Sequence, residues 1–226
     1  MRAVRVGALL GSIAWASELA DGILLTFILM SFVHTSPTTP TWLEDLVGPL
    51  TGLIGATILV LIIIALLNFY KGASHFRRFD PSLDVGRIGV LLIIGGVLVS
   101  LLGSWIAIMA TSAADGSGQE SVPPALTLSM KGVAIAGSGL MIVGSLLFAI
   151  MMLRLSREGL GRGFGIGGLL YLAREVLRTL TTLGLMVILS ADVISFLGGI
   201  LGFTSMLLIY RTAGISLRGF IPREPP

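Results

Sequence analysis

The chain has 226 residues, of which 54% are hydrophobic and 12% charged, and its mean hydropathy is +0.98. Soluble domains carry about 25% charged residues, so a water-soluble core of this size could not hide so much apolar surface. The formal charge of +3 matters less than where the charges stand, and the lack of cysteine excludes disulfides, thiolate chemistry and cysteine-based metal sites.

Six apolar segments are each long enough to cross a membrane as a helix, which takes about 20 residues. They are residues 6–33, 46–70, 86–111, 126–153, 166–190 and 193–210. The connecting segments are short and rich in Pro, Gly, Ser or charge, so none of them holds a soluble domain. The sequence therefore predicts an all-α membrane protein, a six-helix transmembrane bundle that forms a single domain over residues 1–226.

The first and last of these segments carry local expectations of their own. Arg2 and Arg5, a short apolar run and then Ala14-Trp15-Ala16 resemble a signal peptide, but the apolar run continues to Val33, so we expect an uncleaved first span. The fifth and sixth segments are separated only by Ala191-Asp192, which predicts a tight helical hairpin there.

Positive charge predicts the orientation. Of the 15 Lys and Arg residues, all except Lys131 fall on one side of the predicted bundle, when Arg174 and Arg178 are counted at the start of the fifth span. Cytoplasmic loops are the ones enriched in Lys and Arg, so both termini are predicted to be cytoplasmic in a multi-pass protein of the cell membrane.

The aromatic residues agree with this orientation. Tyr70, Tyr171 and Tyr210 fall at the predicted cytoplasmic border, whereas Trp42 and Trp105 fall near the outer one. Amphipathic rings prefer the interfacial depth of a bilayer.

Glycine spacing predicts how the helices pack, because lipid gives helices no hydrophobic reason to associate and small residues mark their contact faces. The pairs Gly7/Gly11, Gly48/Gly52 and Gly198/Gly202 have the GxxxG spacing, and Gly89, Gly96 and Gly103 recur every seven residues. Gly132/Gly139 and Gly137/Gly144 repeat that spacing of seven in the fourth span. We interpret these positions as close helix contacts.

Charged residues inside the first and fifth spans form the main candidate site. Glu18 and Asp21 continue a stripe of small residues on one face of the first helix, and Arg174 and Arg178 share one face of the fifth. Counting back from the outer ends of the spans places Glu18 and Arg174 about 6 and 4.5 Å inside the cytoplasmic edge. We predict a buried charge network of Glu18, Asp21, Arg174 and Arg178, with Glu175 at its edge.

Two other motifs have simpler interpretations. Residues 163–168 fit the GxGxxG pattern, but they stand between two membrane helices and not in a βαβ unit, so a glycine-rich turn and a close-packed helix start are favoured over a nucleotide site. The basic residues that flank the spans are interpreted as contacts to anionic lipid headgroups. These residues are Lys71, Arg77, Arg78, Arg154, Arg157, Arg162 and Arg211.

At residues 86–103 (GRIGVLLIIGGVLVSLLG), which follow residues 70–80 (YKGASHFRRFD), the chain resembles a family of archaeal integral membrane proteins of unknown function. Its members are similar in having Gly-rich spans, a Gly-x-Ile-Gly element that opens the third span and a late Ile-Tyr-Arg, as at Ile209-Tyr210-Arg211. The resemblance implies an archaeal source and a multi-span fold. It implies no reaction and carries over no functional residue.

Two classes of function remain. One is a structural or accessory protein that acts through helix contacts, as a homo-oligomer or as a subunit of a larger membrane assembly. The other is a small transporter or channel that uses the charged cluster in the inner leaflet. No catalytic constellation, metal ligand set or cofactor motif is found, so no enzyme activity, metal or cofactor is expected. The expected partners are membrane lipids and other membrane subunits or copies of this chain, and not nucleic acid.

Overall fold

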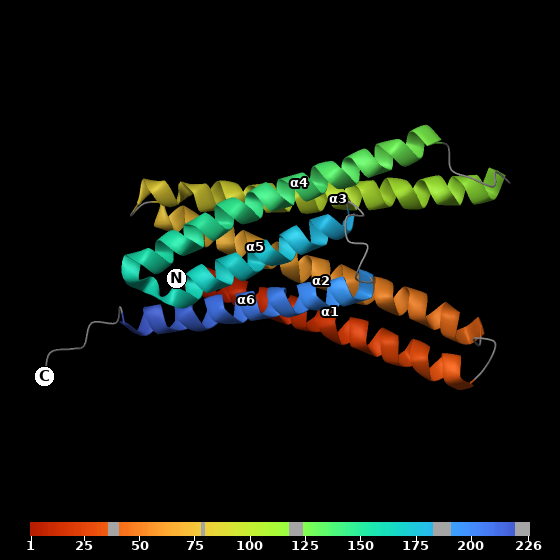
Figure 1. Ribbon diagram of the computed structural model, residues 1–226, viewed down its shortest axis with the longest axis horizontal. Coiled ribbons are helices and arrows are strands. Elements are labelled where there is room, and N and C mark those ends of the chain that lie inside the picture. The colour runs from red at the N-terminus through yellow and green to blue at the C-terminus, as the bar shows by residue number, and fades with distance from the viewer. Residues whose placement is uncertain (36–40, 78–79, 118–123, 183–190, 220–226) are drawn as a thin grey trace, which may run out of the picture.

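The computed structural model describes the backbone of residues 1–35, 41–77, 80–117, 124–182 and 191–219. Side chains are described for residues 1–20, 52–77, 80–110, 129–181 and 193–216. Within these ranges the chain forms six long helices (Figure 1). They are α1 (Arg2–Thr35), α2 (Thr41–Phe76), α3 (Asp84–Ser117), α4 (Pro124–Leu155), α5 (Arg162–Thr182) and α6 (Ala191–Gly219).

Five described segments are long and apolar enough to cross a membrane, which makes the chain a multi-pass, all-α membrane protein. They are Arg2–Ala20, Gly52–Phe76, Pro81–Ala110, Ser129–Leu160 and Val193–Ser216. The sequence predicted six such spans. The described part of α5 is not among the five, because Arg174, Glu175 and Arg178 stand close together in it.

The helices α5 and α6 pack against each other, but the prediction that Ala191-Asp192 form the turn between them is wrong, because these two residues begin α6. The segment 183–190 that precedes them lies outside the described residues.

The six helices form a closed ring. Each helix packs against the next one in chain order, and α6 returns to pack against α1. The contact between α2 and α3 is the least extensive of these neighbouring contacts, and the α1–α2 and α3–α4 pairs diverge from one another away from the N-terminus (Figure 1). The packing between neighbouring helices of the ring is therefore least extensive between α2 and α3.

Glycine holds the closest pair of helices together. A methyl group added at Gly89 in α3 would lie 2.7 Å from the carbonyl oxygen of Gly144 in α4, and one at Gly96 would lie 2.7 Å from that of Gly137. Any larger side chain at these positions would push the two backbones apart. The packing role predicted for the seven-residue glycine spacing is confirmed at these four positions.

Other glycines vary in their roles. Gly7 packs closely against α2 and Gly11 against α6, as their GxxxG spacing predicted. For Gly132 and Gly139 the prediction of a helix contact is wrong, since a methyl group at either position would meet nothing within 4 Å. Both residues are exposed, so the spacing of seven alone does not identify the contact face.

Short turns join the helices at one end. Asp80 caps a 3₁₀ turn, η1 (Pro81–Leu83), and its carboxylate accepts a hydrogen bond of 2.8 Å from the backbone N–H of Ser82. Between α4 and α5, a π-helical turn, η2 (Ser156–Leu160), contains Gly159 with φ of 80°, a conformation that side chains other than glycine rarely adopt. These turns bring α3 and α5 back along the helices that precede them.

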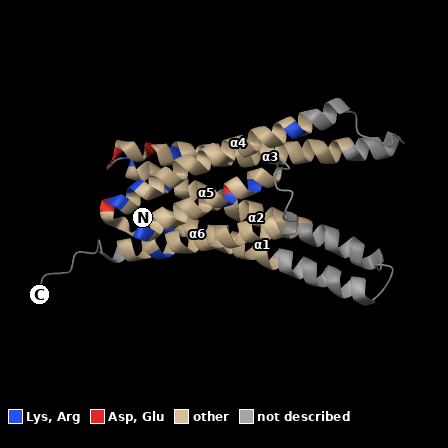
Figure 2. Cartoon of the chain, viewed as in Figure 1, with Lys and Arg blue, Asp and Glu red and all other residues tan. Residues whose placement is uncertain are grey.

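Basic residues gather at the end of the bundle that holds these turns, which we call the basic end (Figure 2). The N-terminus and the end of α6 lie there too (Figure 1). The described bases of this end are Arg2, Arg5, Lys71, Arg77, Arg87, Arg154, Arg157, Arg162 and Arg211. Arg78 lies outside the described residues, and Lys131 lies near the start of α4, whose other end is at the basic end. That the basic end faces the cytoplasm stays a prediction.

Aromatic side chains fill the middle of the ring on the side of the basic end. Phe69 of α2 packs edge to face on Phe148 of α4 with ring centroids 5.2 Å apart, and Phe148 packs on Tyr171 of α5 at 5.5 Å. All three side chains are at most 4% exposed. This aromatic plug, consisting of Phe69, Phe148 and Tyr171, links three helices across the interior.

Candidate functional site

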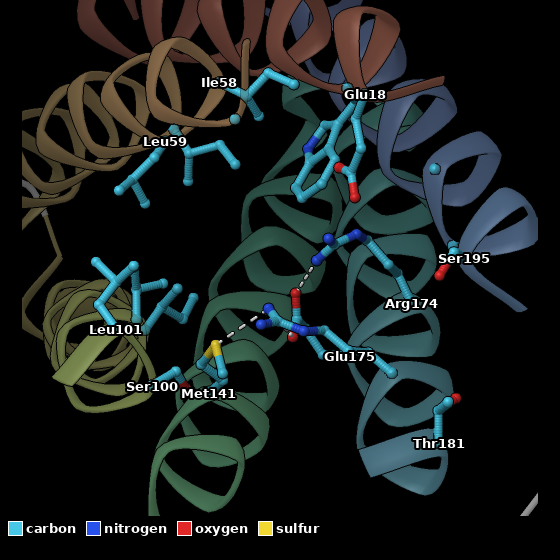
Figure 3. A pocket seen from close by; sticks show the side chains of 18 of the residues that line it. Glu18, Ile58, Leu59, Ser100, Leu101, Met141, Arg174, Glu175, Thr181 and Ser195 are labelled. Atoms are coloured by element: carbon cyan, nitrogen blue, oxygen red, sulfur yellow. Dashed lines mark hydrogen bonds and ion pairs between the residues drawn. The ribbon is translucent and has the colours of Figure 1, made fainter. Parts of the chain in front are cut away.

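A cavity of about 710 Å³ lies on the side of the aromatic plug away from the basic end (Figure 3). All six helices contribute to its wall. Representative lining residues, in chain order of their helices, are Glu18, Leu59, Leu101, Met141, Arg174 and Ser195. The volume is within the range of pockets that hold small organic molecules, which is about 300–1,000 Å³.

The charged wall of this cavity comes mainly from α5, whose amphipathicity is inverted. An amphipathic helix in water turns its charges outward, whereas α5 exposes Ile166, Leu169 and Val176 and buries Arg174 and Glu175. An apolar outer stripe with charges inside is the arrangement expected of a helix whose outer face meets lipid.

Arg174, Glu175 and Arg178 form the centre of the charge cluster. Arg174 Nη1 is paired directly with Glu175 Oε1, and Arg178 Nη1 lies 4.0 Å from Glu175 Oε2. The Glu175 side chain is 2% exposed and that of Arg178 is 47% exposed. The sequence placed Glu175 at the edge of the network, but the structure places it between the two arginines. The i, i+3 spacing puts Glu175 and Arg178 on one face of the helix, and the long Arg174 side chain reaches its chain neighbour Glu175.

Trp15 joins the cluster from α1, and sequence reasoning missed it. The Arg174 guanidinium carbon lies 3.5 Å from the centre of the Trp15 ring, which is close enough for a cation–π interaction. Gly202 of α6 allows this stack, because a side chain there would meet both Trp15 and Arg174. The available signal was the spacing of Trp15 and Glu18, which puts both on one face of α1.

The two acids of α1 are only partly placed. Glu18 lines the cavity and points toward Arg174, within electrostatic range of both Arg174 and Arg178 (Figure 3). Asp21 belongs to α1, but its side chain lies outside the described residues, so its place in the network stays a prediction.

The cluster lies deeper in the bundle than the sequence predicted. Arg5 donates a hydrogen bond of 3.2 Å to the Tyr210 hydroxyl, which sets the start of α1 level with the basic end. Glu18 stands 13 positions after Arg5, or about 20 Å along the helix. Arg174 stands 12 positions after the start of α5, or about 18 Å. If the basic end lies at the headgroups of a hydrocarbon layer about 30 Å thick, these levels are near the middle of the layer.

Two related predictions change with this depth. Arg174 and Arg178 line the cavity in the middle of the bundle and do not belong to the basic end. Tyr171 is 4% exposed in the core and does not lie at an interface, whereas Tyr210 does contact Arg5 at the basic end. The difference arose because the cytoplasmic edge of the membrane was counted from the ends of the apolar segments. The length of an apolar segment does not give the depth of a residue in the bundle.

The residues assigned to lipid headgroups lie at the basic end, apart from the cavity. Lys71, Arg157, Arg162 and Arg211 are exposed there. Arg77 lies 3.8 Å from a carboxylate oxygen of Asp84, and Arg154 donates a hydrogen bond of 2.6 Å to the carbonyl oxygen of Ser82. Their exposure is compatible with headgroup contact, which stays a prediction.

The GxGxxG segment is part of α5, where its glycines pack against neighbouring helices. A methyl group at Gly167 would lie 3.0 Å from the carbonyl oxygen of Ser205 in α6, and one at Gly168 would lie 2.7 Å from Met152 Cβ in α4. The Ser205 hydroxyl also donates a hydrogen bond of 2.7 Å to the Gly167 carbonyl oxygen. These contacts position α5, and with it the charged wall of the cavity.

No protein-family model, no curated protein and no solved structure matches this chain. The resemblance to an archaeal membrane protein family therefore gains no support, and the site itself has to carry the functional inference.

Proposed function

We propose that this chain is a small transporter that binds a polar or charged ligand in the mid-membrane cavity and moves it across the bilayer. The observation that carries the proposal is the cavity of about 710 Å³ beside the buried Arg174–Glu175 pair. Protein interiors are close-packed, and an ion pair that served only to join helices would need no hollow of this size beside it.

The cost of the charges supports the same proposal. A charged side chain near the middle of a bilayer is unfavourable by at least about 2.5–3.5 kcal/mol, and such residues mark ligand and ion pathways in many membrane proteins. Here Arg174, Glu175 and Arg178 stand together on α5, whose 21 described residues are long enough to cross a membrane. We propose that α5 is the sixth span and that its charges are retained for binding.

The aromatic plug gives the proposal a direction. Phe69, Phe148 and Tyr171 lie between the cavity and the basic end, so they would block entry to the cavity from that end. Transport then requires a second state in which α2, α4 and α5 move apart at the plug. With the basic end in the cytoplasm, the plug would close the cytoplasmic side of the cavity in this state.

Cysteine labelling tests whether the cavity is filled with water, and the lack of native cysteine makes each introduced thiol unique. Ser100 of α3 lines the cavity, while Leu98 on the same helix is 54% exposed on the outer surface. In liposomes we expect a membrane-impermeant maleimide to label Ser100→Cys and not Leu98→Cys. Failure to label Ser100→Cys would favour the accessory role, because the cluster would then be dry.

Transport itself is tested in liposomes that contain the purified protein, with a panel of radiolabelled organic acids, phosphate esters and amines. We expect saturable uptake of at least one compound, which Arg178→Gln abolishes and Lys131→Gln leaves unchanged, because Lys131 lies outside the cavity. The orientation is tested in whole cells, where Lys131→Cys should react with the impermeant maleimide and Lys71→Cys should not.

A further inference from the structure

The cavity has two unlike walls. Its charged wall comes from α1 and α5, and the facing wall from α2 and α3 is lined largely by apolar residues such as Ile58, Leu59, Val97 and Leu101 (Figure 3). A small inorganic ion would gain nothing from that apolar wall. A ligand that has both a polar head and an apolar body would bury surface against each.

The charged wall indicates the chemistry of the head. Arg178 lines the cavity with a side chain that is 47% exposed, and its Nη1 donates to the sulfur of Met141 at 3.5 Å among its contacts. A guanidinium that faces a cavity can give two parallel hydrogen bonds to a phosphate or carboxylate. A head with an anionic oxygen group would therefore fit beside Arg178.

Glu175 adds a second requirement. Its Oε2 atom is buried and accepts no hydrogen bond within the described residues, although Arg178 lies 4.0 Å from it. A buried acceptor that receives no hydrogen bond costs about 1–3 kcal/mol, so a ligand that supplies a donor gains affinity. A head that combines an anionic group with a nearby hydroxyl or ammonium group satisfies both Arg178 and Glu175.

The route into the cavity lies between α2 and α3. Gly55 and Ala56 of α2 line the cavity yet are exposed, as are Leu101 and Ser104 of α3. A methyl group at Gly55 would meet nothing within 4 Å, so within the described part of the chain this face of α2 is not covered by a neighbouring helix. Gly55 stands 15 positions before Tyr70, or about 22 Å along the helix, which is a depth within the hydrocarbon layer.

We propose that the ligand of this cavity is a membrane lipid with an anionic head, which enters between α2 and α3, places its head at Arg178 and Glu175 and leaves its acyl chains against the α2–α3 wall. The proposal rests on the proposed function, since it names the ligand class of the same cavity. The depth of the opening favours a lipid over a water-soluble amphipath, because acyl chains can extend through it into the bilayer while the head stays in the cavity.

Trp15 is a built-in reporter of lipid entry, because it is 4% exposed and lines the cavity. In the Trp42→Phe/Trp105→Phe background it is the only tryptophan, since the chain has three. The probe is phosphatidylglycerol with brominated acyl chains, which quench tryptophan on contact, titrated into phosphatidylcholine vesicles. Brominated phosphatidylcholine in the same vesicles is the matched lipid without net charge.

We expect the anionic brominated lipid to quench Trp15 at a lower mole fraction than the zwitterionic one. Arg178→Gln should raise the mole fraction needed for half-maximal quenching about 10- to 100-fold, and Arg178→Lys should have a smaller effect. Lys131→Gln should change nothing. A variant that keeps only Trp105, which is 62% exposed, should be quenched equally by both lipids.

Equal quenching of Trp15 by both lipids, or quenching that does not depend on Arg178, would overturn the lipid proposal. A water-soluble alkyl phosphate that protects Ser100→Cys from maleimide, with Trp15 unaffected by brominated lipid, would also overturn it and leave the transporter proposal in place. If Ser100→Cys is not labelled and Trp15 is not quenched, both proposals fail.

Discussion

Glu175→Gln is the sharpest test of the intramembrane cluster. The substitution removes one negative charge from a side chain that is 2% exposed and leaves the shape nearly unchanged. Arg174, which is 6% exposed, would then lose the carboxylate that neutralises it. Breaking a buried ion pair by removing one partner destabilises proteins by about 3–5 kcal/mol, because the other charge stays buried without compensation.

Two features of the site reduce that magnitude. Arg174 keeps its stack on Trp15, and a desolvated cation–π contact is worth about 2 kcal/mol. Arg178 is 47% exposed and its 4.0 Å pair is long, so its share of the loss is small. We therefore expect Glu175→Gln to lower the free energy of unfolding by about 2–4 kcal/mol, which is about a 30- to 1,000-fold change in the unfolding equilibrium.

The assay is unfolding in mixed micelles by titration with sodium dodecyl sulfate, followed by far-UV circular dichroism. Glu158→Gln is the matched control, because Glu158 is an exposed acid at the basic end and its loss should stay within about 0.5 kcal/mol. The double variant Arg174→Met/Glu175→Leu removes both charges together and should regain at least half of the loss.

Two results would refute the reasoning. If the free energy of unfolding of Glu175→Gln stays within about 1 kcal/mol of that of the native protein, the Arg174–Glu175 ion pair is hydrated and not buried in a poorly polarisable interior. If the double variant is no more stable than Glu175→Gln, the cost does not come from an uncompensated charge, and a packing defect at α5 would explain it instead.

Three further predictions concern the scaffold. Gly144→Ala should lower the free energy of unfolding by about 1–3 kcal/mol, because the new methyl group would lie 2.6 Å from a backbone oxygen of α3. Gly139→Ala meets open space, so in the same titration it should leave this free energy unchanged or raise it by up to about 1 kcal/mol. Tyr210→Phe removes the acceptor of the Arg5 hydrogen bond and should cost about 0.5–1.5 kcal/mol, with helix content unchanged. Hydrogen bonds from Ser82 in the η1 turn hold the pKa of Asp80 below its ordinary value. The stabilisation from these bonds is therefore present above about pH 4, and it is lost as the pH falls through the lower pKa of the folded state. Melting curves from pH 7 downward should show this loss in the native protein and not in Asp80→Asn.

The inward face of α5 could be predicted because it depends on local periodicity. Arg174 and Arg178 are four positions apart, and a helix places such residues on one side whatever surrounds it. The same rule should have brought Glu175 to the centre, since it stands three positions before Arg178. What the rule could not give was the side chain on the other side of the cavity.

That side chain is Trp15, which is 159 positions from Arg174 in the sequence (174 − 15). Their contact exists because α6 lies between α1 and α5 in the ring and carries Gly202 at the level where they meet. No local pattern near Trp15 or Arg174 encodes the order of helices around a ring. For the same reason, the sequence did not predict which glycine spacing faces a neighbour and which faces outward.

The sequence by itself determined that the chain is a membrane protein, that it is helical and that the charges of its spans must face inward. The reason is that the free energy of transferring apolar and charged groups into lipid depends on short segments of the chain. Only the tertiary structure decided the depth of the charges, the aromatic plug and the cavity. These depend on where neighbouring backbones approach and where they separate, as at the open side between α2 and α3. The positions of the backbones depend on the sum of many contacts between residues far apart in the chain. These contacts decide whether a buried charge lies against packed atoms or beside a cavity that a ligand can enter.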